Sequence, residues 1–238
     1  MYILSVSTFS LNSSFSLLKR ENNSVRTVVE FNLYYNDIDN QSQLNIFPYF
    51  FKLVKEKMGI DLKDIKEVLL LKGPGFFTSL RIGAIISQTL AFINHADLYS
   101  IDTFRAILNV LLYFYKDYVG NKSDILVVIK VANNKFKLAY FNRYYFDKLG
   151  DMSSNDLVYS VQELSKKDFY EKVREYSLNN NLILVSPNLE LEDQWELENV
   201  GVNFIDLRDI FTSSNIAKAS FYLNNLTKED PISVNLNY

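Results

Sequence analysis

The order of hydrophobic and polar positions along the chain predicts strands and helices in two similar halves. In the first half, three short apolar or β-branched runs are separated by polar clusters, which is typical of a three-stranded meander. Apolar residues then recur at three- and four-residue steps, which indicates helices between buried strands. We expect strands at residues 2–8, 15–19, 25–31, 68–71 and 98–101, and helices at residues 44–58, 77–93 and 102–114.

The second half repeats this order of elements with unrelated residues. Two alternating strands are followed by a third, for which the sequence offers two positions, and then by helices and buried strands in turn. We expect strands at residues 125–131, 136–141, either 144–148 or 157–159, 182–185 and 202–205, with helices at residues 167–176, 191–197 and 214–226. The repeat is therefore architectural and not a repeat of sequence.

A βββαβα order that occurs twice favours an α/β fold of two ribonuclease-H-like lobes. Each lobe is then a mixed sheet flanked by helices, as in the superfold of actin, Hsp70 and sugar kinases. With a hinge at residues 118–123, we expect an N-terminal lobe at residues 1–118 and a diverged C-terminal lobe at residues 119–238. The last helix can pack back on the N-terminal lobe. This fold class alone says nothing about activity.

The composition excludes several kinds of chemistry. The 238 residues include no cysteine and one histidine, His95, which excludes disulfides, zinc-thiolate sites, thiol nucleophiles and paired-histidine metal sites. A net charge of −3 provides no overall positive field for holding nucleic acid. The N-terminus lacks a basic region, and no apolar run reaches 18 residues. We expect a cytoplasmic protein that lies outside the membrane and has neither a metal nor a cofactor of its own.

The segment at residues 71–93, LKGPGFFTSLRIGAIISQTLAFI, carries the most specific information in the chain. It predicts a strand, a tight turn at Gly73, Pro74 and Gly75, and a helix with Thr78 as its N-cap. No Lys-Ser or Lys-Thr follows the glycines, so the turn is not a P-loop. Two interpretations stay open: a sharp turn that places a helix against the sheet, and a weak anion site at the helix N-terminus.

Within this segment, GPGFFTSLRIG resembles the GPGSFTGLRIG signature of the TsaB (YeaZ) family and departs from it at Phe76 and Ser79. The resemblance is weaker at ILSVSTFS, residues 3–10, and at DPISVNL near the end of the chain. It implies a non-catalytic scaffold that, together with a TsaE-like ATPase, enables a TsaD-like subunit to transfer a threonylcarbamoyl group to a tRNA adenosine. It also implies a homodimer when the chain is alone, tRNA contact only through the complex, and nucleotide only at an interface with TsaE.

The ends of the first strand of each half argue against catalysis by this chain. Kinases and ATPases of the superfold hold Mg²⁺ with a carboxylate on these strands, because hard cations need anionic oxygen ligands. Here Ser7 and Thr8 stand at that position in the first half, and Lys130 stands in the second. We therefore predict no catalytic, cofactor-binding or metal-binding residues. A diverged sugar- or acyl-phosphate kinase is the alternative, and an interaction module outside tRNA modification is a third hypothesis.

The helix at residues 77–93 is apolar nearly all round, with a stripe of small residues spaced four apart. Such a helix is either covered by its own chain or meets a partner. The resemblance favours a partner, because it implies that the first two helices pair with those of TsaD. We predict an interface made of Phe47, Phe50, Phe51, Leu80, Gly83, Ile86, Ser87, Leu90 and Ala91.

Two further features stay open. Arg81 is a cation in the first turn of a helix, which the helix dipole disfavours, so we expect it to pair with a carboxylate. The single tryptophan, Trp195, lies within an acidic stretch, which is typical of a solvated surface and less often of a docking site. The acidic residues of that stretch are Glu190, Glu192, Asp193, Glu196 and Glu198.

Overall fold

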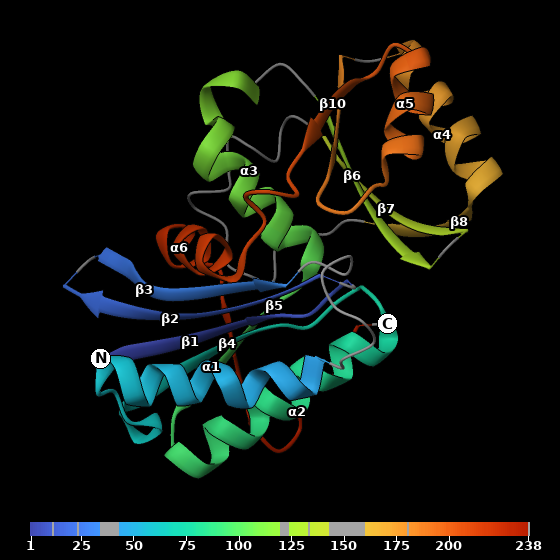
Figure 1. The fold of residues 1–238 in the computed structure, drawn as a ribbon. Coiled ribbons are helices and arrows are strands. Elements are labelled where there is room, and N and C mark those ends of the chain that lie inside the picture. The colour runs from blue at the N-terminus through green and yellow to red at the C-terminus, as the bar shows by residue number, and fades with distance from the viewer. Residues whose placement is uncertain are drawn as a thin grey trace. The chain divides into compact units, whose positions relative to one another are not determined.

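The computed structural model describes residues 1–10, 12–22, 24–33, 43–119, 124–132, 134–142, 160–179 and 181–237. The chain divides into two compact units, each built on a mixed β-sheet (Figure 1). The first unit combines Met1–Thr103 with Thr212–Tyr238, and the second is Phe104–Phe211. Residues 104–118, which we expected in the N-terminal lobe, thus lie in the second unit, and residues from 212 onward lie in the first.

The sheet of the first unit has six strands in the order β11-β5-β4-β1-β2-β3. Strands β1, β4 and β5 run parallel to one another, and β2, β3 and β11 each pair with a neighbour in antiparallel fashion. Apolar residues dominate β1 and β4, and β1, β2 and β4 are all buried along most of their length. The strands are β1 (Tyr2–Ser7), β2 (Ser13–Glu21), β3 (Ser24–Leu33), β4 (Ile65–Leu71), β5 (Asp97–Ile101) and β11 (Thr227–Glu229).

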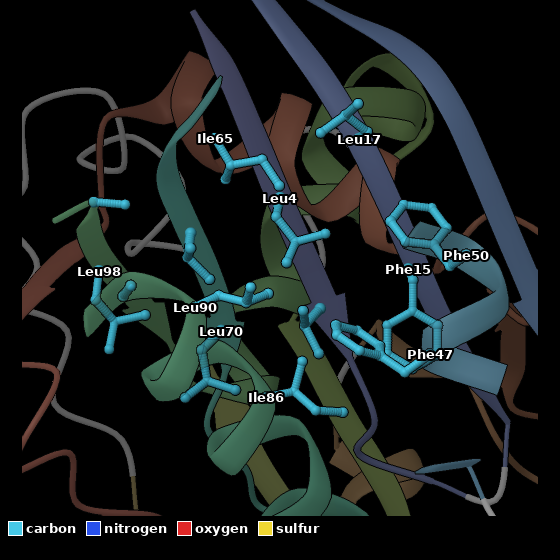
Figure 2. Packing of buried hydrophobic residues seen from close by; sticks show 14 of the residues in the cluster. Leu4, Phe15, Leu17, Phe47, Phe50, Ile65, Leu70, Ile86, Leu90 and Leu98 are labelled. Carbon is cyan, nitrogen blue, oxygen red and sulfur yellow. The ribbon is translucent and has the colours of Figure 1, made fainter. Parts of the chain in front are cut away.

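Two helices, α1 (Gln43–Met58) and α2 (Phe77–Asn94), cover one face of this sheet, and α6 (Ser213–Leu223) covers the other (Figure 1). A short 3₁₀ helix, η2 (Leu62–Asp64), precedes β4. Between the sheet and the first two helices lies a hydrophobic core. Figure 2 shows Ile86 and Leu90 of α2 beside Leu70, and Phe47 and Phe50 of α1 around Phe15.

The last helix is anchored to the first sheet by hydrogen bonds at its N-terminus. The hydroxyl of Thr212 caps α6 by accepting from the Asn215 N–H, and the Glu30 carboxylate accepts the N–H of Ser214 at 2.9 Å. A carboxylate at this end is favoured by the helix dipole. Ser213 adds a buried contact, because its N–H donates to the Ser14 hydroxyl at 2.8 Å. The final helix therefore packs on the sheet of the first unit.

The tail after β11 also belongs to the first unit. Val234 and Leu236 pack against the core of this unit. The N–H of Asn237 donates to the carbonyl of Lys72 at 2.9 Å, just before the glycine turn. Lys72 is held again by Glu229, whose carboxylate lies 2.8 Å from the lysine Nζ. The tail thus lies directly against the chain that leads into α2.

The second unit contains a five-stranded sheet in the order β10-β9-β6-β7-β8. Its strands are β6 (Asp124–Ala132), β7 (Lys135–Phe141), β8 (Val161–Ser165), β9 (Leu182–Ser186) and β10 (Asn203–Asp206). Its helices are α3 (Thr103–Val119), which begins at the boundary of the units, α4 (Lys166–Asn179) and α5 (Leu191–Asn199). Both positions offered for the third strand, 144–148 and 157–159, lie outside the described residues, and β8 lies just after them.

Both units arrange their first five strands in the same spatial order. Counted along the chain within each unit, the third, second, first, fourth and fifth strands lie side by side. The first three are antiparallel, and the fourth and fifth run parallel to the first. The architectural repeat predicted from the sequence is therefore confirmed. Among the helices of the described ranges, none combines the length and apolar character that crossing a membrane requires.

Candidate protein interface

The turn between β4 and α2 is fitted tightly against the end of β1. The N–H of Phe76 donates to the carbonyl of Phe9 at 2.7 Å. A Cβ on Gly75 would lie only 2.1 Å from that carbonyl oxygen, so a side chain at this position is excluded. Gly73 has a φ of +101°, which disfavours any other residue. Gly73 and Gly75 thus allow the backbone of the turn to pack closely against neighbouring backbone.

The backbone carbonyls of this turn accept hydrogen bonds from another residue of the same chain. The hydroxyl of Thr103 donates to the carbonyl of Pro74 at 2.8 Å, and the Thr103 N–H donates to the carbonyl of Gly73 at 2.8 Å. The predicted N-cap is wrong: Phe76 is the N-cap residue of α2, it supplies no side-chain cap, and Thr78 lies inside the helix. These contacts support the interpretation of the segment as a turn that positions α2.

The face of α2 that we predicted to meet a partner is covered by this chain itself. Gly83, Ser87 and Ala91, the small-residue stripe, are all buried, and a Cβ on Gly83 would lie 2.2 Å from Oγ1 of Thr8. Small residues here let the helix approach its own sheet closely. The other predicted interface residues that are also buried are Phe47, Phe50, Leu80, Ile86 and Leu90. The small-residue stripe therefore faces inward, which corrects our assignment of it to a partner.

The remaining predicted interface residue, Phe51, is partly buried and joins an aromatic cluster. Its ring lies 4.6 Å from that of Phe47 and 5.4 Å from that of Phe50, both in edge-to-face geometry. Phe15 of β2 extends the cluster, with its ring 5.0 Å from that of Phe47. The three phenylalanines of α1 thus belong to the hydrophobic core or pack against it. Tyr49, the remaining aromatic residue of this helix, is 67% exposed and points outward.

On its outward side, α2 presents a different row of large side chains. Phe77, Arg81, Ile85, Phe92 and Ile93 are exposed, and we call these five residues the outer face of α2. The apolar members range from 49% exposed at Phe77 to 65% at Ile93. The Arg81 guanidinium lies over the ring of Phe77, 3.9 Å from its centroid, which shields part of the ring. Several large apolar side chains exposed on one helix are typical of an interaction surface.

The first-strand positions that carry carboxylates in kinases of the superfold are filled differently in each unit. Ser7 and Thr8 are buried at the end of β1. In the second unit Lys130 of β6 is buried, and its Nζ lies 2.7 Å from the carboxylate of Glu190 and 3.4 Å from that of Asp193. Neither of these positions therefore carries the carboxylate with which kinases of the superfold hold Mg²⁺.

Asp193 is the centre of this polar cluster in the second unit. Besides Lys130, it contacts the Nζ of Lys166 at 2.9 Å and accepts the hydroxyl of Tyr170 at 3.0 Å. Burial alone would raise the pKa of Asp193, but these hydrogen bonds and positive charges outweigh it, so its pKa lies below the usual range. Burial and the charge of Asp193 raise the pKa of Tyr170. The cluster consists of satisfied pairs and stabilises the unit.

Comparisons with known proteins agree with this architecture. A family model described as TsaD, tRNA N6-adenosine threonylcarbamoyltransferase, matches residues 39–117. The tRNA threonylcarbamoyladenosine biosynthesis protein TsaB of Buchnera aphidicola subsp. Acyrthosiphon pisum is 26% identical over 210 residues, which cover 87% of this chain and 88% of that protein.

Two solved structures from Pseudomonas aeruginosa share the fold. One, described as a protein with similarity to peptidase YeaZ, has 12% identity and a TM-score of 0.64 over 100% of this chain and 98% of its own. The other, YeaZ, has 13% identity and a TM-score of 0.58 over 95% of this chain and 96% of its own.

The strand order of both units, together with these two structures, defines an α/β protein of two ribonuclease-H-like units, the actin-like superfold. Within that class, the sequence similarity to TsaB spans most of the chain and includes the GPGFFTSLRIG segment. The resemblance to the TsaB (YeaZ) family is therefore confirmed.

Proposed function

We propose that this chain is a non-catalytic scaffold subunit of a tRNA N6-threonylcarbamoyladenosine transferase complex. It binds and activates a TsaD-like catalytic subunit, and a TsaE-like ATPase joins the complex. The similarity to TsaB over most of the chain supports this role. The partner supplies the chemistry and the contact with tRNA, which fits a net charge of −3 on this chain.

The observation that carries the proposal is the outer face of α2. It exposes four large apolar side chains within residues 39–117, the segment that matches the TsaD family model. We assign the binding of the partner to α2, one of the two helices expected from the sequence, through this outer face. The same face pairs two copies of the chain when the partner is absent, because a large apolar surface is unfavourable in water.

The first strands of the two units support a scaffold and not a kinase. Ser7 and Thr8 offer no carboxylate for Mg²⁺, and Lys130 is held by Asp193 and Glu190. The rival kinase predicts that Mg²⁺-ATP raises the melting temperature of the isolated chain and that Ser7→Asp changes this response. The scaffold predicts no such rise for the chain alone.

The outer face can be tested by two substitutions that leave the core intact. Ile85→Asp and Phe92→Ser each place a polar group in a dry interface, and together they should weaken co-purification with the TsaD-like subunit at least ~10-fold, which corresponds to ~1.4 kcal/mol. Leu178→Ser is the matched control, because Leu178 is an exposed apolar residue on α4, outside the outer face. Unfolding curves of all variants establish that the fold is kept.

Analysis of modified nucleosides in bulk tRNA provides the functional readout. Replacing the native chain by the Ile85→Asp/Phe92→Ser variant should lower threonylcarbamoyladenosine, whereas Leu178→Ser should leave it unchanged. If depletion of the whole chain leaves this nucleoside at its normal level, the proposed function is wrong. If depletion lowers it but the outer-face variant does not, the function stands and the assigned surface is wrong.

A further inference from the structure

A second exposed apolar surface lies on α5 in the second unit. Leu191 and Trp195 are 71% and 72% exposed, and a spacing of four residues places them on one side of the helix. Asp193 and Leu197, on the opposite side, are buried. The helix thus packs on its unit through its inner side, and it presents Leu191 and Trp195 to solvent.

Exposed acidic residues flank these two side chains along α5, and the nearest cation that interacts with Glu192 and Glu196 is Lys166, which is already paired with Asp193. Glu192, Glu196 and Glu198 are exposed, and none of them takes part in an ion pair among the described residues. Asp193 and Glu190, in contrast, are paired with lysines of the same unit. The excess of negative charge therefore lies on the outer side of α5, next to Leu191 and Trp195.

We propose that this side of α5 binds a segment of a partner protein in which an apolar side chain is flanked by arginine or lysine. The apolar residue covers Leu191, and a guanidinium stacks on the indole of Trp195, the aromatic ring that binds cations best. The three exposed glutamates attract the basic groups and accelerate association. Tryptophan is also enriched among the residues that dominate binding energy at protein interfaces.

The negative charge on this surface favours a basic protein segment over RNA as its partner. Three exposed carboxylates repel RNA phosphates, so we expect no binding of tRNA here. The surface is on a different helix from the outer face of α2 and on a different unit, so it serves a contact beyond the one in the proposed function. A variant at this site therefore tests a separate interaction.

The single tryptophan makes a direct measurement possible, because all indole fluorescence of the chain comes from Trp195. The probe is a 15-residue amphipathic peptide of leucine and arginine, and the matched probe has the same leucines with glutamate in place of arginine. We expect the basic peptide to shift the emission of Trp195 to shorter wavelength, to protect it from acrylamide, and to bind at least 10-fold more tightly than the acidic peptide. Binding should weaken as salt is raised.

Three variants make this test specific. Glu196→Lys combined with Glu198→Lys should reverse the preference between the two peptides, and Leu191→Ser should weaken both by several-fold. Glu56→Lys combined with Asp117→Lys makes the same change of net charge at exposed positions elsewhere and should leave the preference unchanged.

Other results would overturn the proposal. Equal binding of the two peptides, or no change in emission with either, would show that α5 does not select a basic partner. A shift that grows with protein concentration alone would assign the surface to a second copy of the chain. Protection of Trp195 by tRNA would assign it to RNA.

Discussion

Gly83 of α2 lies directly over Thr8 at the end of β1, so close that a Cβ on the glycine would be 2.2 Å from the threonine Oγ1. That hydroxyl oxygen is buried, and among the described residues it has no hydrogen-bond partner. The absence of a side chain at position 83 therefore sets how closely α2 approaches its sheet. The contact belongs to the core of the first unit and not to an interface.

This contact predicts that the cost of one substitution depends on which residue stands at position 8. Gly83→Ala in the native chain should lower the free energy of unfolding by about 1–3 kcal/mol, because the steric clash outweighs the better helix propensity of alanine. With Thr8→Ala already present, the same substitution should cost less than ~0.5 kcal/mol, since the clashing hydroxyl is gone. Urea unfolding of the four chains measures both effects. Equal costs in the two backgrounds would contradict the assigned contact.

A second prediction concerns Gly73 and the tail that packs on it. A Cβ on Gly73 would lie 2.1 Å from the carbonyl oxygen of Asn237, and the φ of +101° is itself unfavourable for alanine. Gly73→Ala should therefore destabilise the chain by about 3 kcal/mol or more and displace the tail. Limited proteolysis should then cut the tail faster, and thermal unfolding gives the loss of stability.

Gly59 offers the matched control for Gly73. It also has a positive φ, +65°, but its Cβ position is open to solvent. Gly59→Ala should cost only about 1–2 kcal/mol, and it should leave proteolysis of the tail unchanged. If Gly59→Ala and Gly73→Ala lose the same stability and leave proteolysis of the tail unchanged, the cost comes from the backbone conformation alone and the tail contact does not contribute.

Asp193 provides a prediction with a defined pH dependence. Its pKa is depressed in the folded chain, so its contribution to stability is present above the pKa of an unfolded aspartate, about 3.9, and is lost as the pH falls through the folded pKa. Asp193→Asn should cost about 3 kcal/mol at pH 7, near the lower end for a broken buried pair, because Glu190 still contacts Lys130. The difference from the native chain should shrink at acidic pH. Glu171→Gln, at an exposed position on α4, should show no such trend.

Glu67 of β4 should show the opposite dependence. Burial raises its pKa, and the nearby Arg20, whose guanidinium is 2.8 Å away, counteracts this only in part. The folded chain therefore holds this proton more tightly than the unfolded chain, and stability falls as the pH rises through the folded pKa. Arg20→Met removes the compensating charge and should cost about 2–3 kcal/mol at pH 7.

The loss caused by Arg20→Met should become smaller as the pH is lowered and Glu67 takes up its proton. Denaturant unfolding of the native chain and of Arg20→Met across the acidic range measures this. Arg26→Met is the control, because Arg26 is exposed and its guanidinium is 3.9 Å from the exposed Glu21. A deficit that stays constant with pH would contradict the ion pair.

The elements that the sequence predicted well are those with strong periodicity. The helix expected at residues 77–93 is α2, Phe77–Asn94, and the strand expected at residues 182–185 is β9, Leu182–Ser186. Their boundaries are clear because Gly75 precedes α2 and a polar stretch precedes β9. The twofold βββαβα order could also be predicted, since it needs only the kinds of elements and their sequence.

The side of α2 that faces outward could not be predicted from the sequence, for a physical reason. A stripe such as Gly83, Ser87 and Ala91 permits close approach, but it does not say whether a sheet or a foreign helix approaches. Both sides of α2 are apolar, so periodicity alone could not distinguish the inner face from Ile85 and Phe92. A usable signal was Arg81, since an unburied cation marks the outward side. Lys130 was recognised as a departure from a carboxylate, but its distant partner Asp193 had no local signal.

The first unit is assembled from segments at both ends of the chain, whereas the second is continuous. During translation the ribosome therefore delivers every residue of the second unit before α6 and β11 become available. Until then the serines of β1 and β2 that later contact Ser213 remain open to water, and the edge of β5 is unpaired. The part of the protein that is made first is thus the part whose folding finishes last, and its half-built sheet needs protection from aggregation throughout that interval.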